Sequence, residues 1–180
     1  MDTRQAYNRW AEQYDTNVNK TRDLEAIALR RTLANKTFNR ILEIGCGTGK
    51  NTEWLQTISR EMVAVDLSEE MLAKAKEKIT AASVSFRQAD ITQDWTFAEG
   101  PFDLITFSLV LEHIEDLHPI FDKAAPCFVP MEEYTLVNFI RLSNTQAQRP
   151  GLKQSREHRL YPVLIIMYQT LQRLLCNVHW

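Results

Sequence analysis

The chain has 180 residues, of which 44% are hydrophobic and 24% charged, and its formal net charge is −2 at pH 7. This composition predicts one globular domain with a sizeable core and excludes a low-complexity chain. The slightly acidic balance argues against a nucleic-acid partner, because nucleic-acid binders usually carry a basic surface. The longest apolar run, Val163 to Met167, is too short to span a bilayer, so we expect no membrane partner either.

Cysteine usage points to a reducing compartment. The three cysteines, Cys46, Cys127 and Cys176, include no C-x-x-C pair, which argues against both a disulfide framework and a zinc site. The first twenty residues contain no apolar core of the kind that a signal peptide needs. We therefore predict reduced thiols, a cytoplasmic location and no metal site.

The first predicted element is a helix over residues 4–14. Its helical spacing places Tyr7, Trp10 and Tyr14 on one face. Such a stripe either packs against the domain or covers a bound ligand, where aromatic rings exclude water. We interpret residues 1–38 as a helical region that acts as a lid.

Between residues 40 and 128, short apolar runs alternate with longer amphipathic ones. We expect strands at 41–44, 62–65, 84–86 and 102–107, and helices at 22–33, 48–59, 68–79 and 117–127. This alternation predicts an α/β fold, a Rossmann-like parallel sheet with helices on both faces. Ligands on such sheets bind at the carboxyl ends of the strands, so the residues directly after each strand are candidates for a site.

The strongest motif is a glycine-rich loop that follows the first predicted strand and opens a helix. It reads Glu43-x-Gly45-x-Gly47-x-Gly49. Glycine lets the backbone turn sharply and approach a ligand closely, and amides at a helix N-terminus favour an anionic group. A dinucleotide fingerprint needs its third glycine at the position of Lys50, so the spacing disfavours a nicotinamide-dependent oxidoreductase.

The tighter glycine spacing resembles motif I of class I S-adenosylmethionine-dependent methyltransferases. Three later segments resemble further motifs of this family, and the N-terminal aromatic stripe resembles an element of its small-molecule branch. The resemblance implies S-adenosylmethionine as the cofactor. The cofactor residues that it implies are Glu43, Gly45, Cys46, Gly47, Gly49, Asp66, Leu67, Met71, Asp90, Ile91, Ser108 and Leu109.

Several of these residues have a specific expected role, and for two of them a structural role is the alternative. Asp66 ends a strand, where a carboxylate accepts both ribose hydroxyls of an adenosine, although it also suits a cap of the next helix. Met71 covers the adenine in the family, but a methionine at this spacing is often a core residue. The resemblance implies that Asp90 meets the adenine amine and that Ser108 and Leu109 lie beside the methyl-bearing sulfur.

The predicted reaction is methylation of a small-molecule acceptor at oxygen or nitrogen. His113 is the candidate base for an acidic acceptor, with ordering of its loop as the alternative role. Methyltransferases that act on nucleobases usually carry an Asp/Asn-Pro-Pro-aromatic run after the fourth strand, whereas this chain has Ser108-Leu-Val-Leu. We therefore expect a small-molecule substrate and no nucleic acid, and the sequence carries no prediction of the oligomeric state.

The C-terminal part departs from the family pattern. We assign residues 1–130 to the methyltransferase domain and residues 131–180 to an atypical tail. The family continues with a glycine turn, a fifth strand and an antiparallel pair, whereas here residues 144–159 are polar and residues 161–176 suit an apolar helix. We predict that the C-terminal strands are missing or replaced by helical or irregular chain.

A shift of the reading frame after Pro130 explains this departure. The codons of Met131 and Glu132, read from the last base of ATG, necessarily encode glycine, and the following codons permit a strand-like continuation. We hypothesise a one-base deletion or a two-base insertion at this point. The alternative function is then a non-catalytic remnant that binds the cofactor weakly or not at all.

Overall fold

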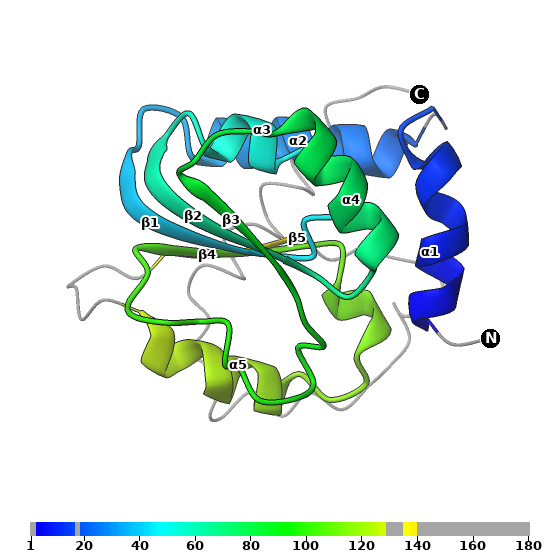
Figure 1. Cartoon of the computed structure of the whole chain (residues 1–180). Coiled ribbons are helices and arrows are strands. Elements are labelled where there is room, and N and C mark those ends of the chain that lie inside the picture. The colour runs from blue at the N-terminus through cyan, green and yellow to red at the C-terminus, as the bar shows by residue number, and fades with distance from the viewer. Residues whose placement is uncertain (1–2, 17–18, 129–134, 140–180) are drawn as a thin grey trace, which may run out of the picture.

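The computed structural model describes residues 3–16, 19–128 and 135–139. In these ranges, five parallel strands form one sheet in the order β3-β2-β1-β4-β5 (Figure 1). The strands are β1 (Phe38–Ile44), β2 (Ser59–Asp66), β3 (Val84–Gln88), β4 (Leu104–Ser108) and β5 (Thr135–Phe139). The chain changes direction across the sheet between β1 and β4, which is where open α/β sheets bind ligands. The predicted Rossmann-like sheet is confirmed.

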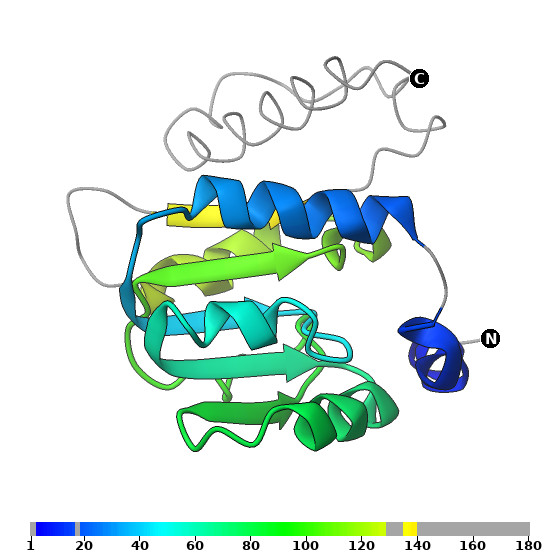
Figure 2. The ribbon, with the colours of Figure 1, turned by 90° about the horizontal axis from the view of Figure 1, so that it is seen from above.

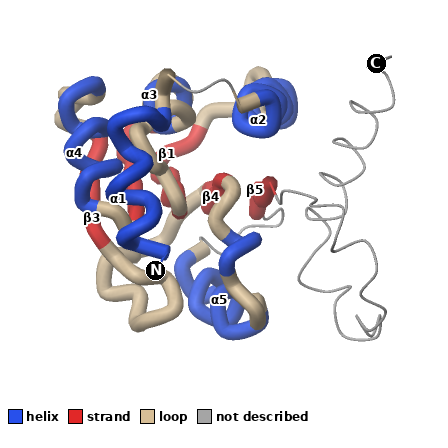
Figure 3. The backbone as a smooth tube through the Cα atoms, turned by 90° about the vertical axis from the view of Figure 1, so that its right-hand side faces the viewer, coloured by secondary structure: helices blue, strands red, loops and turns tan. Residues whose placement is uncertain are grey.

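Helices cover both faces of this sheet, as predicted (Figure 3). They are α2 (Lys20–Thr32), α3 (Thr52–Leu55) and α4 (Glu69–Lys78) on one face and α5 (His118–Ala124) on the other. Along β1, Ile41 packs in a cluster with Leu29 of α2, while its neighbour Leu42 packs with Phe121 of α5. Side chains of a strand alternate between its faces, so a sheet covered on both sides needs nearly continuous apolar runs. None of the described helices is long and apolar enough to cross a membrane.

The helices begin where local capping favours them. The side chain of Asn19 accepts hydrogen bonds from the backbone amides of Thr21 and Arg22 at the start of α2. Ser68 caps α4 in the same way by accepting from the amide of Met71 at 3.2 Å. These bonds satisfy amides that have no partner within the helix, and the Ser68 cap agrees with the predicted helix over residues 68–79.

Helix α1 (Thr3–Tyr14) lies across the carboxyl ends of the strands, on the side to which their arrowheads point (Figure 2). Two hydrogen bonds hold it there. The Ser68 hydroxyl donates to Asn8 Oδ1 at 2.6 Å, and the Thr48 hydroxyl donates to Asp15 Oδ1 at 2.6 Å. Asp15 also forms an ion pair with Lys78 of α4. The helix is therefore placed over the edge of the sheet at which ligands bind.

The helix predicted over residues 48–59 is much shorter, because α3 spans only Thr52–Leu55. Gly49 has φ +85°, in the left-handed region, so the chain cannot enter a right-handed helix at this point. The Ile58 amide then donates to Leu55 O in a tight turn, and β2 starts at Ser59. The glycines that made the loop recognisable thus also delay and shorten the helix that follows it.

The prediction that the fifth strand is missing is wrong. Residues 135–139 form β5 and pair in parallel with β4 from Leu104 to Ser108. The sequence Thr-Leu-Val-Asn-Phe combines β-branched and aromatic residues, and pairing with the edge of β4 satisfies the backbone groups of β5 that face β4. The sheet therefore extends past Pro130, where we had placed the domain boundary. Residues 140–180, including the apolar helix predicted at 161–176, lie outside the described residues.

Candidate functional site

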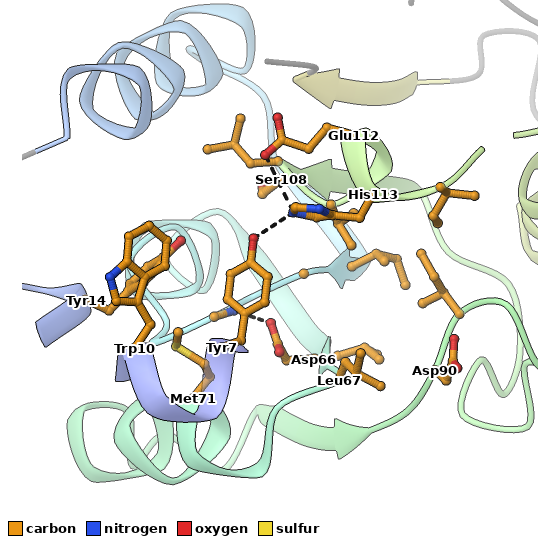
Figure 4. A pocket seen from close by; sticks show the side chains of 18 of the residues that line it. Tyr7, Trp10, Tyr14, Asp66, Leu67, Met71, Asp90, Ser108, Glu112 and His113 are labelled. Atoms are coloured by element: carbon orange, nitrogen blue, oxygen red, sulfur yellow. Dashed lines mark hydrogen bonds and ion pairs between the residues drawn. The ribbon is translucent and has the colours of Figure 1, made fainter. Parts of the chain in front are cut away.

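A cavity of about 280 Å³ opens at the carboxyl ends of the strands, next to α1. Loops after β1, β2, β3 and β4 contribute to its wall, together with α1 and the start of α2 (Figure 4). The predicted residues that line it are Tyr7, Trp10, Tyr14, Gly45, Gly47, Asp66, Leu67, Met71, Asp90, Ile91, Ser108, Leu109 and His113. Glu43, Cys46 and Gly49, which the sequence also assigned to the cofactor, are buried and do not line it.

The glycine loop is shaped by backbone conformation. Gly45, Gly47 and Gly49 all have positive φ angles, of 79°, 54° and 85°. The amides of Gly45 and Cys46 donate to the Val65 carbonyl at 2.8 and 3.0 Å, which fixes the loop to the end of β2. Left-handed conformations of this kind are accessible to glycine at little steric cost. The loop can therefore bring its backbone close to a ligand in the cavity.

The three glycines do not have the same surroundings. A Cβ on Gly49 would lie 2.8 Å from Ile79 Cδ1 and 3.2 Å from Ala75 Cβ, inside the contact with α4. A Cβ on Gly47 would have Tyr14 Cε1 as its nearest neighbour, at 3.8 Å, and would enter the cavity. Gly49 is thus required for packing, whereas Gly47 leaves room for a ligand.

We expect Gly49→Ala to destabilise the fold by roughly 2–4 kcal/mol, because it combines backbone strain with overpacking. Gly47→Ala carries the same kind of strain without the clash, so its loss of stability should be the smaller one. In folded protein, Gly47→Ala should weaken ligand binding more than Gly49→Ala does. Urea unfolding and calorimetric titration separate the two effects, and equal losses of stability for both variants would contradict this assignment.

Asp66 stands at the end of β2 and joins two loops. Its Oδ2 accepts from the Gly47 amide at 2.8 Å, and its Oδ1 accepts from the Ser68 amide at 2.8 Å. Burial raises the pKa of this carboxyl, while the hydrogen bonds from Ser68, Gly47 and Leu67 oppose the rise. Both readings of Asp66 thus have support in the geometry, since it holds the start of the next segment and also lines the cavity.

Asp90 and Met71 differ in their exposure to solvent. Asp90 is exposed, and its Oδ1 accepts from the Thr92 amide at 2.9 Å and from the Thr92 hydroxyl at 2.7 Å. Met71 is buried at 1% exposure, yet its side chain forms part of the cavity wall near Tyr7 and Trp10 (Figure 4). Met71 is therefore both a core residue and a wall residue, and the two readings of it do not exclude each other.

Glu43 is completely buried behind the loop. Its Oε2 accepts from the Thr52 hydroxyl at 2.6 Å, and its Oε1 has no hydrogen-bond partner in the described part of the chain. Burial raises the pKa of Glu43 to about 8, with the nearby carboxylates Glu25 and Asp66 adding to the rise. Its role in this structure is to connect β1 to α3, beneath the glycine loop.

Tyr7 and His113 close the cavity from opposite sides. The Tyr7 hydroxyl lies 2.7 Å from His113 Nε2, which joins α1 to the turn after β4 (Figure 4). Glu112 Oε1 lies 3.6 Å from the same nitrogen. A tyrosine and a carboxylate therefore face one imidazole nitrogen at the rim of the cavity, and this contact supports both readings of His113, as a base and as a residue that orders its loop.

The backbone is strained directly after the end of β4. Leu109 has φ +55° although it is not glycine, and it lines the cavity. A bulky residue in this region costs of order 1–3 kcal/mol and persists where the surrounding structure holds it. The following residue, Val110, lies close to Gly45. A Cβ added to Gly45 would lie only 2.9 Å from Val110 Cβ. The glycine loop and the turn after β4 thus fit together closely.

Sequence reasoning missed the basic residue of the cavity. Arg22 lines it near Tyr14, whose carbonyl oxygen accepts from Arg22 Nη1 at 2.5 Å. The guanidinium also lies over the Tyr14 ring, 4.0 Å from its centroid. Burial raises the pKa of the Tyr14 hydroxyl, and Arg22 opposes the rise. The cap at Asn19, which starts a helix with a basic first turn, is the signal that could have pointed to this position.

Comparison with known proteins identifies the domain. A family model described as a methyltransferase domain matches residues 41–130, which are 90 of the 180 residues. Malonyl-acyl-carrier-protein O-methyltransferase of Priestia megaterium is 34% identical over 122 residues, 65% of this chain and 43% of that protein. Nodulation protein S of Azorhizobium caulinodans is 29% identical over 116 residues, 64% of this chain and 52% of that protein. The chain spans about half the length of the curated relatives that it matches.

A solved structure agrees in fold. The N-methyltransferase NodS from Bradyrhizobium japonicum, in complex with S-adenosyl-L-homocysteine, matches with a TM-score of 0.62 and 25% identity. The match covers 72% of this chain and 69% of that one.

Proposed function

The chain belongs to the class I S-adenosylmethionine-dependent methyltransferases, and from this premise we propose that it transfers the methyl group of S-adenosylmethionine to a small-molecule acceptor. The observation that carries the proposal is the cavity itself. It combines the open glycine loop, a carboxylate at the end of β2 and an aromatic helix over the opening. The relatives include an O-methyltransferase and an N-methyltransferase, so the proposal covers both acceptor atoms.

The residues present fit this cofactor. Gly47 has no side chain where a ligand would approach, and a Cβ there would enter the cavity and contact Tyr14 Cε1 at 3.8 Å. Asp66 offers carboxylate oxygens to ribose hydroxyls, and Ile91, Leu67 and Met71 supply apolar wall for an adenine ring. Arg22 offers a guanidinium to a carboxylate, a pairing with matched geometry. These groups would hold the adenosine and methionine parts at opposite ends of the cavity.

When bound, S-adenosylmethionine supplies an electrophilic methyl group on a sulfonium ion. The chain itself mainly orients the acceptor, and good orientation supplies roughly 7–11 kcal/mol of a reaction barrier. Tyr7, Trp10 and Tyr14 line the cavity from α1, where their rings would cover a bound ligand and exclude water. His113 Nε2 stands at the rim, where it can take a proton from a hydroxyl, carboxyl or ammonium acceptor.

Calorimetric titration of the purified protein with S-adenosylmethionine tests the proposal, with NADH as a control. Saturable binding of S-adenosylmethionine alone is the expected result. It would justify a screen of small acids, phenols and amines as methyl acceptors. Absence of binding by a folded, monodisperse sample would overturn the proposal and leave the non-catalytic remnant as the reading of this chain.

If His113 is the base, we expect His113→Gln to lower kcat by about 100-fold for the best acceptor of that screen, within the usual range for acid–base catalysis. Affinity for S-adenosylmethionine should change little, because the predicted contacts of His113 are with the acceptor. Tyr7→Phe is the matched control, since it keeps the ring and removes the hydroxyl that bonds to His113. Similar small losses of kcat in both variants would favour the role in ordering the loop.

The remaining expectations form part of the same proposal. A cytoplasmic location is in keeping with the two cysteines that the described residues contain, Cys46 and Cys127, which are both free thiols. Burial raises the pKa of both thiols, which keeps them in the unreactive protonated form. We assign neither of them a part in the reaction.

A further inference from the structure

A second buried carboxylate, besides Glu43, lies behind the cavity wall. Glu25 of α2 is only 5% exposed and does not line the cavity. Asn51 Nδ2 lies 3.0 and 2.9 Å from its two carboxylate oxygens. The same Asn51 Nδ2 also lies 3.3 Å from Ser108 Oγ. Three segments that are distant in sequence, α2, the loop before α3 and the end of β4, therefore meet at this carboxylate.

The hydrogen bonds suit the charged form of Glu25. Both carboxylate oxygens of Glu25 lie next to Asn51 Nδ2, which can only donate hydrogen bonds. A proton on the Glu25 carboxyl would therefore find no acceptor at this nitrogen. The contrast with Glu43 is clear, because Glu43 has one oxygen without a partner. Burial raises the pKa of Glu25, while the bonds from Asn51 and Ser108 oppose the rise. The network thus offsets part of the cost that burial imposes on a negative charge at this position.

No cation forms an ion pair with Glu25 among the described residues. None of the ion pairs there includes Glu25, and the one cation that lowers its pKa, Lys50, forms its own exposed pair with Asp23. A buried charge without a partner is costly. It is most readily explained where a positively charged ligand group binds nearby.

The position of Ser108 shows where that group would lie. Ser108 stands on one side of the cavity, with Asp66, Leu67 and Asp90 on the other (Figure 4). Asn51 Nδ2 is 3.3 Å from Ser108 Oγ, so Asn51 links Ser108 to the Glu25 carboxylate. In S-adenosylmethionine the sulfonium links the adenosine to the amino-acid part, so it would lie between the parts that Asp66 and Arg22 would hold, in the cavity that Ser108 also lines.

We propose that Glu25 is a positioning residue that fixes Ser108 and holds a negative charge behind it, so that the cavity prefers the sulfonium of S-adenosylmethionine over the neutral thioether of S-adenosylhomocysteine. The inference rests on the proposed function. The two ligands differ only in the methyl group and its positive charge. A countercharge therefore acts on their ratio of affinities, and it favours exchange of the spent cofactor for a fresh one.

Calorimetric titration of Glu25→Gln with both ligands tests this. Glutamine keeps the size of the side chain and removes its charge. We expect the affinity for S-adenosylmethionine to fall about tenfold, on the order of one partly screened charge interaction. The affinity for S-adenosylhomocysteine should change by less than about threefold. Glu53→Gln on α3 is the matched control, because Glu53 is an exposed glutamate and the change in net charge is the same.

Two double variants complete the test. Glu25→Gln with Asn51→Asp moves the carboxylate to the other side of the same hydrogen bond, and is expected to restore the preference for S-adenosylmethionine. If Glu25→Gln does not fold, Glu25→Met with Asn51→Leu removes the charge and its donor together, which protein interiors tolerate better. The same selective loss is expected of it.

Equal losses of affinity for the two ligands, or no loss for either, would overturn the inference while leaving the proposed function intact. Failure of the wild-type chain to bind either ligand would instead overturn the proposed function itself. The ratio of affinities is the informative quantity, because a purely structural role of Glu25 would weaken both ligands together.

Discussion

Replacement of Asp66 by alanine is expected to weaken S-adenosylmethionine binding by 100-fold or more. Hydrogen bonds to a charged group contribute about 1.5–3 kcal/mol each, and a carboxylate at the end of β2 can accept two from a ribose. The same change removes the bonds from the Gly47 and Ser68 amides, each 2.8 Å long, so the glycine loop loses a support as well. Calorimetric titration measures the affinity, and thermal unfolding measures the cost to the fold.

Asp94→Ala serves as the control for Asp66→Ala, because Asp94 is an exposed aspartate that does not line the cavity. A folded Asp66→Ala protein that binds S-adenosylmethionine as tightly as the wild type would show that Asp66 acts only as a support for the next segment. Asp66→Asn refines the result, since it retains the shape and one acceptor oxygen. An intermediate affinity for Asn would indicate that both oxygens contribute.

Glu43→Gln is expected to flatten the dependence of stability on pH. Because the pKa of Glu43 is raised to about 8 in the folded chain, the folded state keeps a proton that the unfolded state has already lost above the usual glutamate value of 4.5. Stability should therefore fall as the pH rises from the unfolded pKa to the folded one. The fall is at most about 1.4 kcal/mol for each pH unit, and it ends above the folded pKa.

Glutamine mimics the neutral carboxyl at every pH and still accepts from the Thr52 hydroxyl. The stability of Glu43→Gln relative to the wild type should thus increase between pH 5 and pH 8, as measured by urea unfolding at both pH values. The exposed Glu77→Gln is the control for the loss of one carboxylate. A difference between Glu43→Gln and wild type that stays constant across this range would mean that Glu43 is charged when buried.

The sequence determined the features that depend on neighbours along the chain. The alternation of apolar runs predicted the parallel sheet, since the side-chain period of a strand is local. Ser68 predicted the start of α4 because a cap bonds an amide only three residues away. The spacing of Gly45, Gly47 and Gly49 predicted the loop, because tolerance of positive φ angles is a property of glycine itself.

Only the tertiary structure decided which distant groups meet. Tyr7 and His113 are 106 residues apart, and Glu25, Asn51 and Ser108 come from three elements. The pairing of β5 with β4, which we had predicted to be missing, likewise depends on an open strand edge that no local pattern records. Contacts of this kind arise when the sheet and its helices pack, because packing alone brings such residues within hydrogen-bond distance. Local sequence therefore specified the cofactor loop, and packing specified the charge behind it and the residues that close it.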